Sequence, residues 1–453
     1  MIINNAIIVT WGIPNQIIPF GSIVIKDGKI VDYGPKIDEK SLPKNEEIVD
    51  AGGQFIMPGN ICAHTHFYGA FARGMATMGT PAQDFVEILE KLWWPLDKAL
   101  DLEDVYYSAL VCIIDAIKHG TTTLFDHHAS QAHIPGSLDA IASAVLESGI
   151  RADLCYEVSD REGALAAKEG IKENVRFYEK CQKANNSLLN AHFGMHASMT
   201  ISEKTMASCR DAAPKSIGFH LHVAEAASDE YDSLDKYGMR IVDRLEKHDL
   251  LNDKTIIAHG VHIDFHEMEL LSKYKCWLST QPRSNMNNAV GMSQIEGMLR
   301  MGVTVCLGND GFSNAMWEEW KACYLGHKLW NRDPRRMPAD QLVKIATENN
   351  SDLATQSFGT GRIGRIEKGA QADLIFVEYH PYTELNTGNL PWHVVFGFHE
   401  SMITSTMVAG KFLMKDRKLT TIDEKKVMPV AYNKSQIVWK KYQHIMSKES
   451  EAG

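Results

Sequence analysis

Eight short apolar runs alternate with longer helix-like stretches through the middle of this chain, and this alternation restricts the fold more than any other feature. The runs are residues 55–62, 121–125, 152–158, 190–195, 217–223, 255–258, 276–281 and 303–308. Helix-like stretches such as residues 102–117 and 263–274 lie between them. Strands that alternate with helices are typical of parallel βα units. Eight such units predict an α/β protein with a (β/α)8 TIM barrel.

Both ends of the chain have a different, strand-rich character. Residues 22–26 and 29–33 are apolar runs joined by Asp27-Gly28, which is a strong signal for a β-hairpin. Residues 372–377 and 403–408 also have the composition of strands. We therefore expect the two ends to fold together into one small β-sandwich domain built from both termini.

These patterns divide the chain into four parts. Residues 1–57 and 369–423 are expected to form the two halves of the β-sandwich domain, and residues 58–368 the barrel between them. Residues 424–453 carry basic and apolar residues at mixed spacing. Surface helices are normally amphipathic, so we interpret this last part as a packing helix and tail rather than a membrane-binding or partner-binding segment.

The composition excludes several classes of protein. Hydrophobic residues make up 44% and charged residues 23% of the 453 residues, which is ordinary for a soluble globular protein and not for a disordered or collagen-like one. The net charge of −10 argues against a nucleic-acid partner, because nucleic-acid binders usually carry a basic face. No apolar run approaches the roughly 20 residues of a membrane span, so no membrane partner is expected.

The cysteines and the N-terminal residues indicate the cellular compartment of the protein. The eight Cys residues include no C-x-x-C pair, which argues against a Cys-based zinc ribbon or redox pair. They stand among apolar residues, as expected of reduced, buried thiols. Residues 1–5 lack the charged segment and cleavage site of a signal peptide. We therefore expect a cytoplasmic protein.

Four of the apolar runs end in residues that can bind a metal ion. His64 and His66 follow the first run, and their i, i+2 spacing points both rings to one face of a strand. His222, His259 and Asp310 stand at the ends of the fifth, sixth and eighth runs. The carboxyl ends of barrel strands meet at one mouth, where TIM-barrel active sites lie. Imidazoles and a carboxylate suit Zn²⁺ or Fe²⁺ and leave room for a water.

Two neighbouring histidines and Asp310 also have ordinary structural interpretations. His220, two residues before His222, is better read as a packing or supporting histidine than as a ligand. His262 is better read as a surface or packing residue of a loop. Asp310 on its own could be a helix N-cap. The metal-site interpretation depends on all four strand ends together, because polar residues at four ends by chance are much rarer than at one.

The joint set of motifs resembles the amidohydrolase superfamily over nearly the whole chain. The motifs are Met57-Pro58-Gly59, His64-Thr65-His66, His222-Val223-Ala224-Glu225, Ala258-His259-Gly260, Pro282-Arg283-Ser284-Asn285 and Leu307-Gly308-Asn309-Asp310-Gly311. The resemblance is to the mononuclear-metal aminohydrolase branch, which holds guanine deaminase, adenosine-type deaminases and triazine chlorohydrolases. Within this branch the chain is most similar to aminohydrolases associated with bacterial purine catabolism and selenium-dependent molybdenum hydroxylases.

The resemblance implies a role for each residue at the mouth. The single metal ion would be held by His64, His66, His222 and Asp310. Asp310 would also accept a proton from the metal-bound water, Glu225 would carry that proton to a ring nitrogen of the substrate, and His259 would polarise the water. His196, after the fourth run, matches a position that contacts substrate in the family.

The fourth run favours one metal ion over two. Binuclear members of the superfamily carry a bridging carboxylated Lys there, whereas residues 188–199 contain no Lys, which leaves Glu225 free for proton transfer. Bound Zn²⁺ lowers the pKa of water from 15.7 to about 7 and so provides hydroxide at neutral pH. The leading hypothesis is a metal-dependent aminohydrolase that uses metal-bound hydroxide to deaminate a purine-like or related nitrogen heterocycle, with Zn²⁺ preferred and Fe²⁺ as the alternative.

Further residues near the expected mouth are candidate substrate contacts: Arg73, His127, His128, Arg283 and Asn285. Each has an alternative interpretation as a loop ion pair, a supporting hydrogen bond or a cap. The tryptophans at residues 93–94 and 317–320 could stack on a heterocycle, although aromatic residues more often lie in the core. Residues 312–314, Phe-Ser-Asn, depart from the small residues common in the family's deaminases and leave the substrate open.

Three alternative functions remain at this point. The same metal and water could open a cyclic amide in an oxidised purine or hydantoin-like ring, or remove chloride from a ring. A non-catalytic relative is disfavoured because Glu225 and Asp310 are both present. The expected partner is a small heterocyclic substrate, and the resemblance implies a homo-oligomer.

Overall fold

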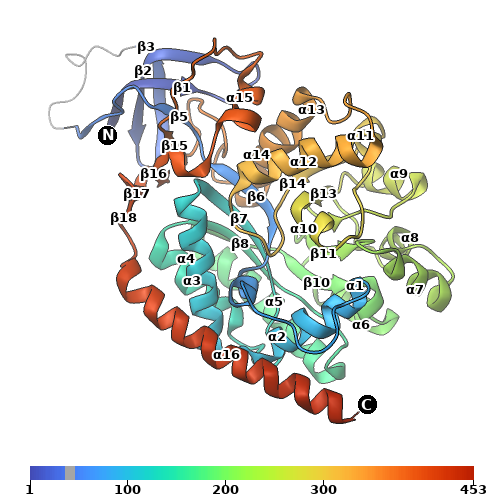
Figure 1. The fold of residues 1–453 in the computed structure, drawn as a ribbon. Helices are drawn as coiled ribbons and strands as arrows, with labels where there is room; N and C mark the ends of the chain where they lie inside the picture. The colour runs from blue at the N-terminus through green and yellow to red at the C-terminus, as the bar shows by residue number, and fades with distance from the viewer. Residues whose placement is uncertain (36–45, 453) are drawn as a thin grey trace.

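Parallel strands form the centre of the computed structural model, which describes residues 1–35 and 46–452 (Figure 1). One sheet has the order β6 (Asn60–Thr65), β7 (Thr121–His128), β8 (Arg151–Tyr156) and β9 (Leu189–Ala191). The other has the order β10 (Phe193–Ala197), β11 (Phe219–Val223), β12 (Ile256–His259), β13 (Trp277–Thr280) and β14 (Thr304–Leu307). Bridges from Val158 to Met195 and from Thr65 to Asp310 connect the two sheets. The arrangement is of the TIM-barrel type, as the alternating pattern predicts.

Helices connect these strands and cover their outer side (Figure 1). The helices between β6 and β12 include α3 (Leu102–Lys118), α4 (Ser137–Ser148), α5 (Gly163–Ala184), α6 (Glu203–Ala212), α7 (Ala227–Tyr237) and α8 (Ile241–Lys247). The later ones are α9 (Phe265–Lys273), α10 (Pro282–Asn287), α11 (Ile295–Arg300), α12 (Met316–Asn331), α13 (Ala339–Val343) and α14 (Asn350–Phe358). A further helix, α15 (Leu390–Gly397), lies between two strands of the terminal sheet. Between β6 and α3 the chain forms the turn η2 (Phe67–Ala72) and the consecutive helical segments α1 (Phe85–Ile88), η3 (Leu89–Trp93) and α2 (Trp94–Ala99).

The run predicted as a single first strand, residues 55–62, is wrong as one element because the chain changes sheets within it. β5 (Phe55–Pro58) belongs to a different sheet from β6. At the junction the Gly59 N–H donates to Asp373 O at 3.0 Å, and the next N–H, of Asn60, donates to Gly120 O at 2.9 Å. A Cβ on residue 59 would lie 2.2 Å from Thr122 Cγ2, so only glycine fits this crossing.

The fourth predicted strand, residues 190–195, is interrupted at His192. β9 ends before this residue and β10 begins after it. The His192 ring is buried, with Nδ1 2.7 Å from Asp153 Oδ1 and Nε2 3.1 Å from Lys254 O. These contacts reach β8 and the loop before β12, at the place where the two parallel sheets meet.

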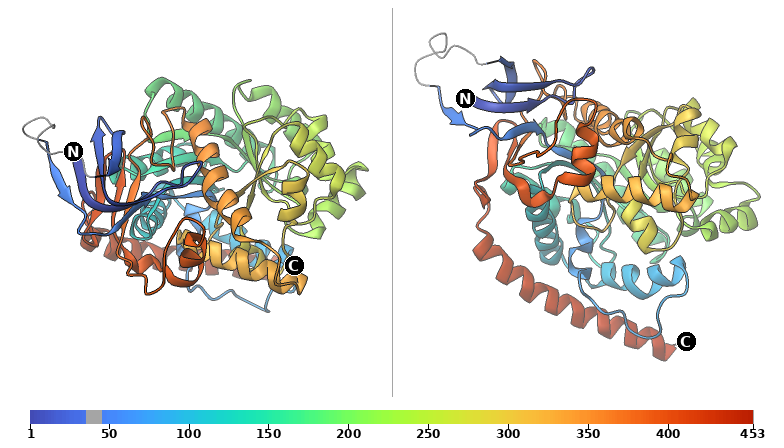
Figure 2. Two further views of the ribbon diagram at one scale, coloured as in Figure 1. Left: turned by 90° about the horizontal axis from the view of Figure 1, so that it is seen from above. Right: turned by 45° about the horizontal axis from the view of Figure 1, so that its top comes forward.

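Strands from both ends of the chain form the third sheet. The N-terminal strands are β1 (Ile2–Val9), β2 (Ile17–Lys26), β3 (Lys29–Pro35), β4 (Ile48–Asp50) and β5. The C-terminal strands are β15 (Leu374–Val377), β16 (Ile403–Val408), β17 (Lys411–Lys415) and β18 (Lys418–Leu419). The order is β18-β17-β16-β15-β5-β1-β2-β3 with β4 beside β1, so the antiparallel β5–β15 pair joins the two ends. The predicted hairpin at Asp27-Gly28 is confirmed by the β2–β3 pairing. Figure 2 shows this sheet beside the parallel strands.

The last helix, α16 (Glu424–Ala452), runs along another side of the molecule against α2 and α3 (Figures 1 and 2). Its Val438 and Tyr442 side chains are buried. The Trp439 Nε1–H donates to Phe71 O at 2.7 Å, and the Tyr442 hydroxyl donates to Lys91 O at 2.5 Å. The helix therefore packs on the segments that follow β6. No helix within the described residues is long and apolar enough to cross a membrane.

Gly194 provides a test of how closely β10 packs against β8. A Cβ on residue 194 would lie 2.3 Å from the main-chain oxygen of Tyr156. We expect Gly194→Ala to lower the free energy of unfolding by about 1–3 kcal/mol, because the main chain has to move to relieve the clash. The measurement is the shift of the thermal unfolding midpoint relative to wild type.

Gly388→Ala is the matched control. The nearest atom to its added Cβ would be Asn386 Oδ1 at 3.4 Å, so its effect should stay within about 0.5 kcal/mol. Equal unfolding midpoints for the two variants would contradict the close contact between β8 and β10.

Candidate metal and active site

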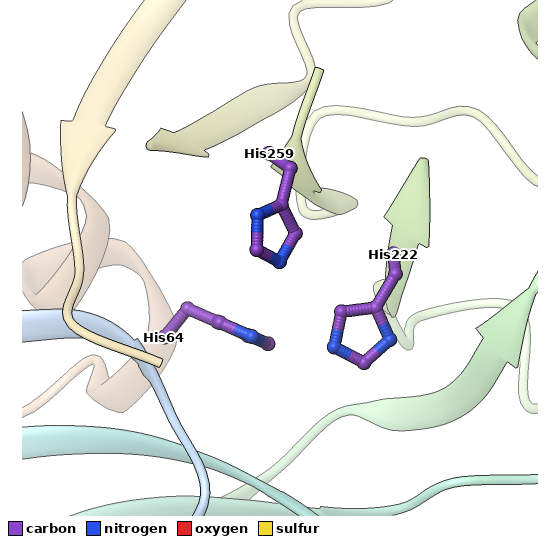
Figure 3. Close-up of side chains that lie close together, drawn as sticks. All are labelled: His64, His222 and His259. Atoms are coloured by element: carbon purple, nitrogen blue, oxygen red, sulfur yellow. The ribbon is translucent and has the colours of Figure 1, made fainter. Parts of the chain in front are cut away.

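The predicted metal-binding residues converge at one end of the parallel strands. His64 and His66 lie at the end of β6, and His222 and His259 lie in β11 and β12. Figure 3 shows the rings of His64, His222 and His259 pointing from three strands into one space. Candidate ligand atoms of these three residues lie within 4.8 Å of one another, and so do those of His64, His66 and Asp310. The structure thus brings together all the residues that the strand ends single out.

Asp310 follows β14 and is held against β6 by its main chain. The His66 N–H donates to Asp310 O at 3.2 Å, and the Asp310 N–H donates to His64 O at 3.1 Å. Ser284 donates a hydrogen bond through Oγ to Asp310 Oδ2. The next helix, α12, has Ala315 at its N-cap position, so Asp310 is not a helix cap. Its other carboxylate oxygen, Oδ1, faces the histidines.

Hydrogen bonds to the main chain orient two of the imidazoles. His66 Nδ1–H donates to His127 O at 2.5 Å, and His222 Nδ1–H donates to His196 O at 3.1 Å. The remaining nitrogens face each other, with 3.2 Å between His66 Nε2 and His222 Nε2. A donor at Nδ1 fixes the ring and keeps the Nε2 lone pair available for a metal ion.

His64 is held from behind by another histidine. Its Nδ1 lies 2.8 Å from His220 Nε2, so His220 supports His64 and does not itself face the space between the ligands. His64 Nε2 is buried and has no hydrogen-bond partner. Burial and the surrounding imidazoles hold the pKa of His64 and of His222 well below the ordinary histidine range, so both rings are neutral. An unpartnered, neutral nitrogen in the interior is the state that a metal ligand requires.

The spacing of the donor atoms fits one ion. His66 Nε2 lies 2.9 Å and His64 Nε2 3.8 Å from Asp310 Oδ1. Ligands about 2.0–2.1 Å from a tetrahedral Zn²⁺ are roughly 3.3 Å apart from each other. The nitrogens of His64, His66 and His222 and the carboxylate of Asp310 therefore have the chemistry and the separation to hold one divalent metal ion.

Glu225 and His259 form a second pair beside these ligands. Glu225 Oε2 lies 3.3 Å from His259 Nε2, and Asn288 Nδ2 donates to Glu225 Oε1 at 3.1 Å. His259 Nδ1 lies 2.9 Å from Asn285 Oδ1, which fixes the ring. Burial is the largest effect on the Glu225 carboxyl and, with the charge of Asp310, raises its pKa to about 7 against the opposing influence of His259. The carboxyl group can therefore both hold and release a proton near neutral pH.

A pocket of about 620 Å³, part of it open to solvent, lies over these residues. We call it the active-site pocket. It is lined by His66, Tyr68, Phe85, Leu89, Trp93, Trp94, Glu157, His196, Ala197, Met199, His222, Glu225, Asp229, Asn288 and Asp310. Trp93 and Trp94 thus form part of an aromatic wall, whereas Trp317 and Trp320 are buried in the core. Flat aromatic side chains are suited to stacking on a heterocycle.

Of the predicted substrate contacts, His196 lines this pocket, and His127 and His128 do not. His127 is fully buried, and its Nε2 lies 3.1 Å from Met195 O and 3.0 Å from His220 O. His128 is also fully buried, with Nε2 3.0 Å from Ser130 Oγ. β7 continues through His128, so both side chains belong to the strand and use these ring nitrogens on other protein groups.

The remaining predicted contacts also lie outside the active-site pocket. Asn285 is buried behind His259. Arg283 forms ion pairs with Glu318 at 2.6 Å and Glu319 at 2.5 Å. Arg283 and the mostly exposed Arg73 line a neighbouring cavity that meets the active-site pocket at Trp93, Asn288 and Asp310. Asn285 therefore positions a site residue, and the two arginines stand on the other side of the Trp93 wall.

Glu157 is a pocket residue that the sequence analysis missed. It follows directly after β8, whereas the predicted run extended to residue 158 and so placed Glu157 inside a strand. Burial acts to raise the pKa of its carboxyl group, but His196, His127 and Arg161 outweigh burial and hold the pKa below the ordinary range. Glu157 therefore presents a buried, ionised carboxylate to the pocket.

The comparison with protein families decides the class of this chain. The model of the amidohydrolase family matches residues 55–413. The chain belongs to the amidohydrolase family. Members of this family are metal-dependent, and this amidohydrolase is a hydrolase that acts on C–N bonds. The narrower resemblance to aminohydrolases associated with selenium-dependent molybdenum hydroxylases stays a prediction.

Relatives match this amidohydrolase over nearly their whole length. A 5'-deoxyadenosine deaminase from Methanosarcina mazei is 31% identical over 436 residues, which cover 95% of this chain and 96% of that protein. A 5-methylthioadenosine/S-adenosylhomocysteine deaminase from Acetivibrio thermocellus is 31% identical, with coverage of 94% and 96%. The crystal structure of an adenosine deaminase from Xanthomonas campestris with bound zinc shares the fold, with a TM-score of 0.84, 23% identity and coverage of 96% and 98%.

Metal removal tests the ligand set. We expect a chelator to lower the thermal unfolding midpoint, because it leaves His64 Nε2 buried without a partner. Zn²⁺ at a hundred times its dissociation constant should restore about 2.7 kcal/mol of stability. His66→Ala should lose stoichiometric zinc, measured by elemental analysis, together with this stabilisation.

His262→Ala is the control for that experiment. Its ring is half-buried and bonds to Val290 O at 3.0 Å, away from the ligands. It should keep both the zinc and the response to chelator. Full zinc content in the His66→Ala protein would mean that the ion binds elsewhere.

Proposed function

We propose that this amidohydrolase removes an exocyclic amine from a purine-like heterocycle and releases ammonia. The observation that carries the proposal is the placement of Glu225, His259 and Asp310 within 4.8 Å of one another beside the metal-ligand set and under an aromatic-walled pocket. The relatives support it, because they are deaminases of adenine-containing compounds. A place in purine catabolism follows from the same chemistry.

The proposed metal site consists of His64, His66, His222 and Asp310, and Zn²⁺ is the proposed ion. A bound divalent ion supplies activated water at neutral pH by lowering the pKa of that water. The zinc reported with the Xanthomonas campestris adenosine deaminase supports this choice for a chain of the same fold. Fe²⁺ has the same ligand preferences and remains the alternative.

The protein side chains then move protons. Asp310 accepts a proton of the attacking water and passes it through Glu225 to the ring nitrogen next to the attacked carbon, so that Asp310 is ionised again. His259, fixed by Asn285, presents Nε2 to the same space as Glu225 and stabilises charge that develops on the attacked carbon's substituents. The proton of the new hydroxyl passes through Asp310 to the amine, which leaves as ammonia.

The finer architecture is also a proposal. We propose that the eight strand positions close into one (β/α)8 barrel at residues 58–368, supported by the Thr65–Asp310 and Val158–Met195 bridges. We propose that the terminal sheet folds over itself as a small sandwich formed by residues 1–57 and 369–423. Its support is a single buried cluster that contains Ile23, Ile56, Phe376 and Met407 from both ends of the chain. A cytoplasmic homo-oligomer is the proposed form of the protein.

Glu225→Gln tests the proton transfer. The variant should keep its metal but release ammonia from aminopurines about 10²–10⁴-fold more slowly, because an amide cannot deliver the proton. The measurement is ammonia release across aminopurines, aminopyrimidines and oxopurines, with metal content determined in parallel. Full turnover with bound metal would exclude Glu225 as the proton carrier.

Glu230→Gln is the matched control for this change. Glu230 is a nearby buried glutamate that pairs with Arg240 at 3.2 Å and does not line the active-site pocket. Its turnover should stay close to wild type.

The same substrate panel separates the alternative reactions. Loss of the ring's ultraviolet absorbance from an oxopurine without ammonia release would indicate ring opening, and chloride release would indicate dechlorination.

A further inference from the structure

The Glu157 carboxylate faces the active-site pocket but has no role in the proton transfers described above. It is buried directly after β8 and lines the pocket together with His196. Arg161 Nη2 lies 3.5 Å from Glu157 Oε1 and 2.7 Å from Asp97 Oδ2, and the Arg161 guanidinium does not line the pocket. His127 Nδ1 lies 3.3 Å from Glu157 Oε2, and His196 Nε2 lies 3.6 Å from Glu157 Oε1. The protein thus holds the carboxylate from several sides, and Glu157 still forms part of the pocket lining.

Glu157 is close to the metal ligands. Its carboxylate, a nitrogen of His196 and a nitrogen of His222 all lie within 4.8 Å of one another. This distance is less than the width of a fused two-ring base. A substrate group that contacts Glu157 therefore belongs to the ring that reacts and not to a substituent far from it.

Glu157 and Glu225 approach the reaction centre from different directions. In the order of strands, Glu157 and His196 come before β11, and His259 and Asp310 come after it. Each carboxylate shares its cluster with a different metal ligand, His222 for Glu157 and Asp310 for Glu225. The two carboxylates therefore lie beside different residues of the proposed metal site.

The hydrogen-bonding groups of the pocket restrict the substrate further. The carboxyl groups that line it, within the part of the chain that the structure describes, belong to Glu157, Glu225, Asp229 and Asp310. The oxygens of Asp229 are occupied by the N–H groups of Met199 at 2.9 Å and Ala224 at 3.1 Å. An ionised carboxylate is a hydrogen-bond acceptor only, so it needs an N–H or O–H on the substrate.

A cyclic guanidine-type carbon has both groups that the two glutamates need, an unprotonated ring nitrogen for Glu225 and a ring N–H for Glu157. In guanine, isocytosine and pterin rings, the amine-bearing carbon lies between an unprotonated ring nitrogen and a ring N–H. Glu225 can protonate the first nitrogen, and Glu157 can accept the hydrogen bond of the second. In adenine, the amine-bearing carbon has only one ring nitrogen beside it, and the other side presents the lone pair of N7, which a carboxylate repels.

We propose that Glu157 determines specificity by accepting the ring N–H beside the reacting carbon, so that the enzyme prefers 2-amino-oxo heterocycles of the guanine type to adenine rings. This inference rests on the proposed deamination. It assigns to Glu157 a direct substrate contact and to Arg161 the task of holding its charge in place.

A matched pair of substrates tests the contact. Guanine and 1-methylguanine differ at the ring N–H that Glu157 would accept. For the metal-loaded wild type, kcat/KM for ammonia release should be about 10- to 100-fold higher with guanine than with 1-methylguanine, and also higher than with adenosine. In Glu157→Gln this preference should fall by about tenfold, mainly through KM, and in Glu157→Ala it should disappear. An unchanged preference in both variants would overturn the inference.

Asp97→Asn is the control variant. It alters the same Arg161 network but does not line the active-site pocket, so it should leave the ratio of guanine to 1-methylguanine turnover unchanged. A ratio that falls as far in Asp97→Asn as in Glu157→Gln would show that the general charge of the network, and not contact with Glu157, sets the preference, and would overturn the proposal.

Binding without turnover separates this inference from the proposed function. Calorimetry with 9-methylhypoxanthine and 1,9-dimethylhypoxanthine, which carry no exocyclic amine, should show tighter binding of the first to wild type and equal binding to Glu157→Ala. That result without ammonia release from any aminated ring would support Glu157 and reject the deamination. Ammonia release from adenosine alone, with equal binding of the two methylated rings, would support deamination and reject the role of Glu157.

Discussion

Polar side chains at the ends of parallel strands cannot remain unpaired in a close-packed interior, and this constraint organises the site. Burial keeps the rings of His64 and His222 neutral, and one bond to a neighbour fixes each ring. The remaining nitrogen of His64 then faces Asp310, and that of His222 faces His66. A divalent cation would satisfy all these groups at once, so the same burial that packs the strands also favours a metal ion between these side chains.

The residues around this centre divide into two kinds. Glu225, His259 and Asp310 face the space where a substrate ring would lie. His127, His220 and Asn285 are buried behind them, and His220 and Asn285 each bond to a ring that faces this space. Such supporting residues use their polar atoms on other protein groups, which is why a polar residue at a strand end is weak evidence for substrate contact.

The TIM-barrel type of fold and the convergence of the candidate metal ligands could be predicted because they depend on local spacing. The i, i+2 histidines and the polar residues after apolar runs need only the geometry of a strand. The errors come from strand ends, which tertiary contacts set. β7 continues through His128, beyond the predicted end at residue 125, whereas β8 ends at Tyr156, before the predicted end at residue 158. Because of the first error, His127 and His128 were expected beyond the strand end. Because of the second, Glu157 was expected within a strand. The change of sheet at Gly59 depends on Thr122, far along the chain.

The β5–β15 pair has a consequence for biosynthesis. Phe55 pairs with Val377 and Pro58 with Leu374. One edge of β5 therefore stays unpaired during synthesis until β15, more than 300 residues later, has been translated. At 5–20 residues per second this interval lasts roughly 15–60 s. During that time the exposed edge is a template for pairing with other chains. The intervening barrel units can fold as they emerge, and the terminal sheet closes last, so a nascent chain that stalls before residue 374 leaves an open sheet edge on an otherwise folded protein.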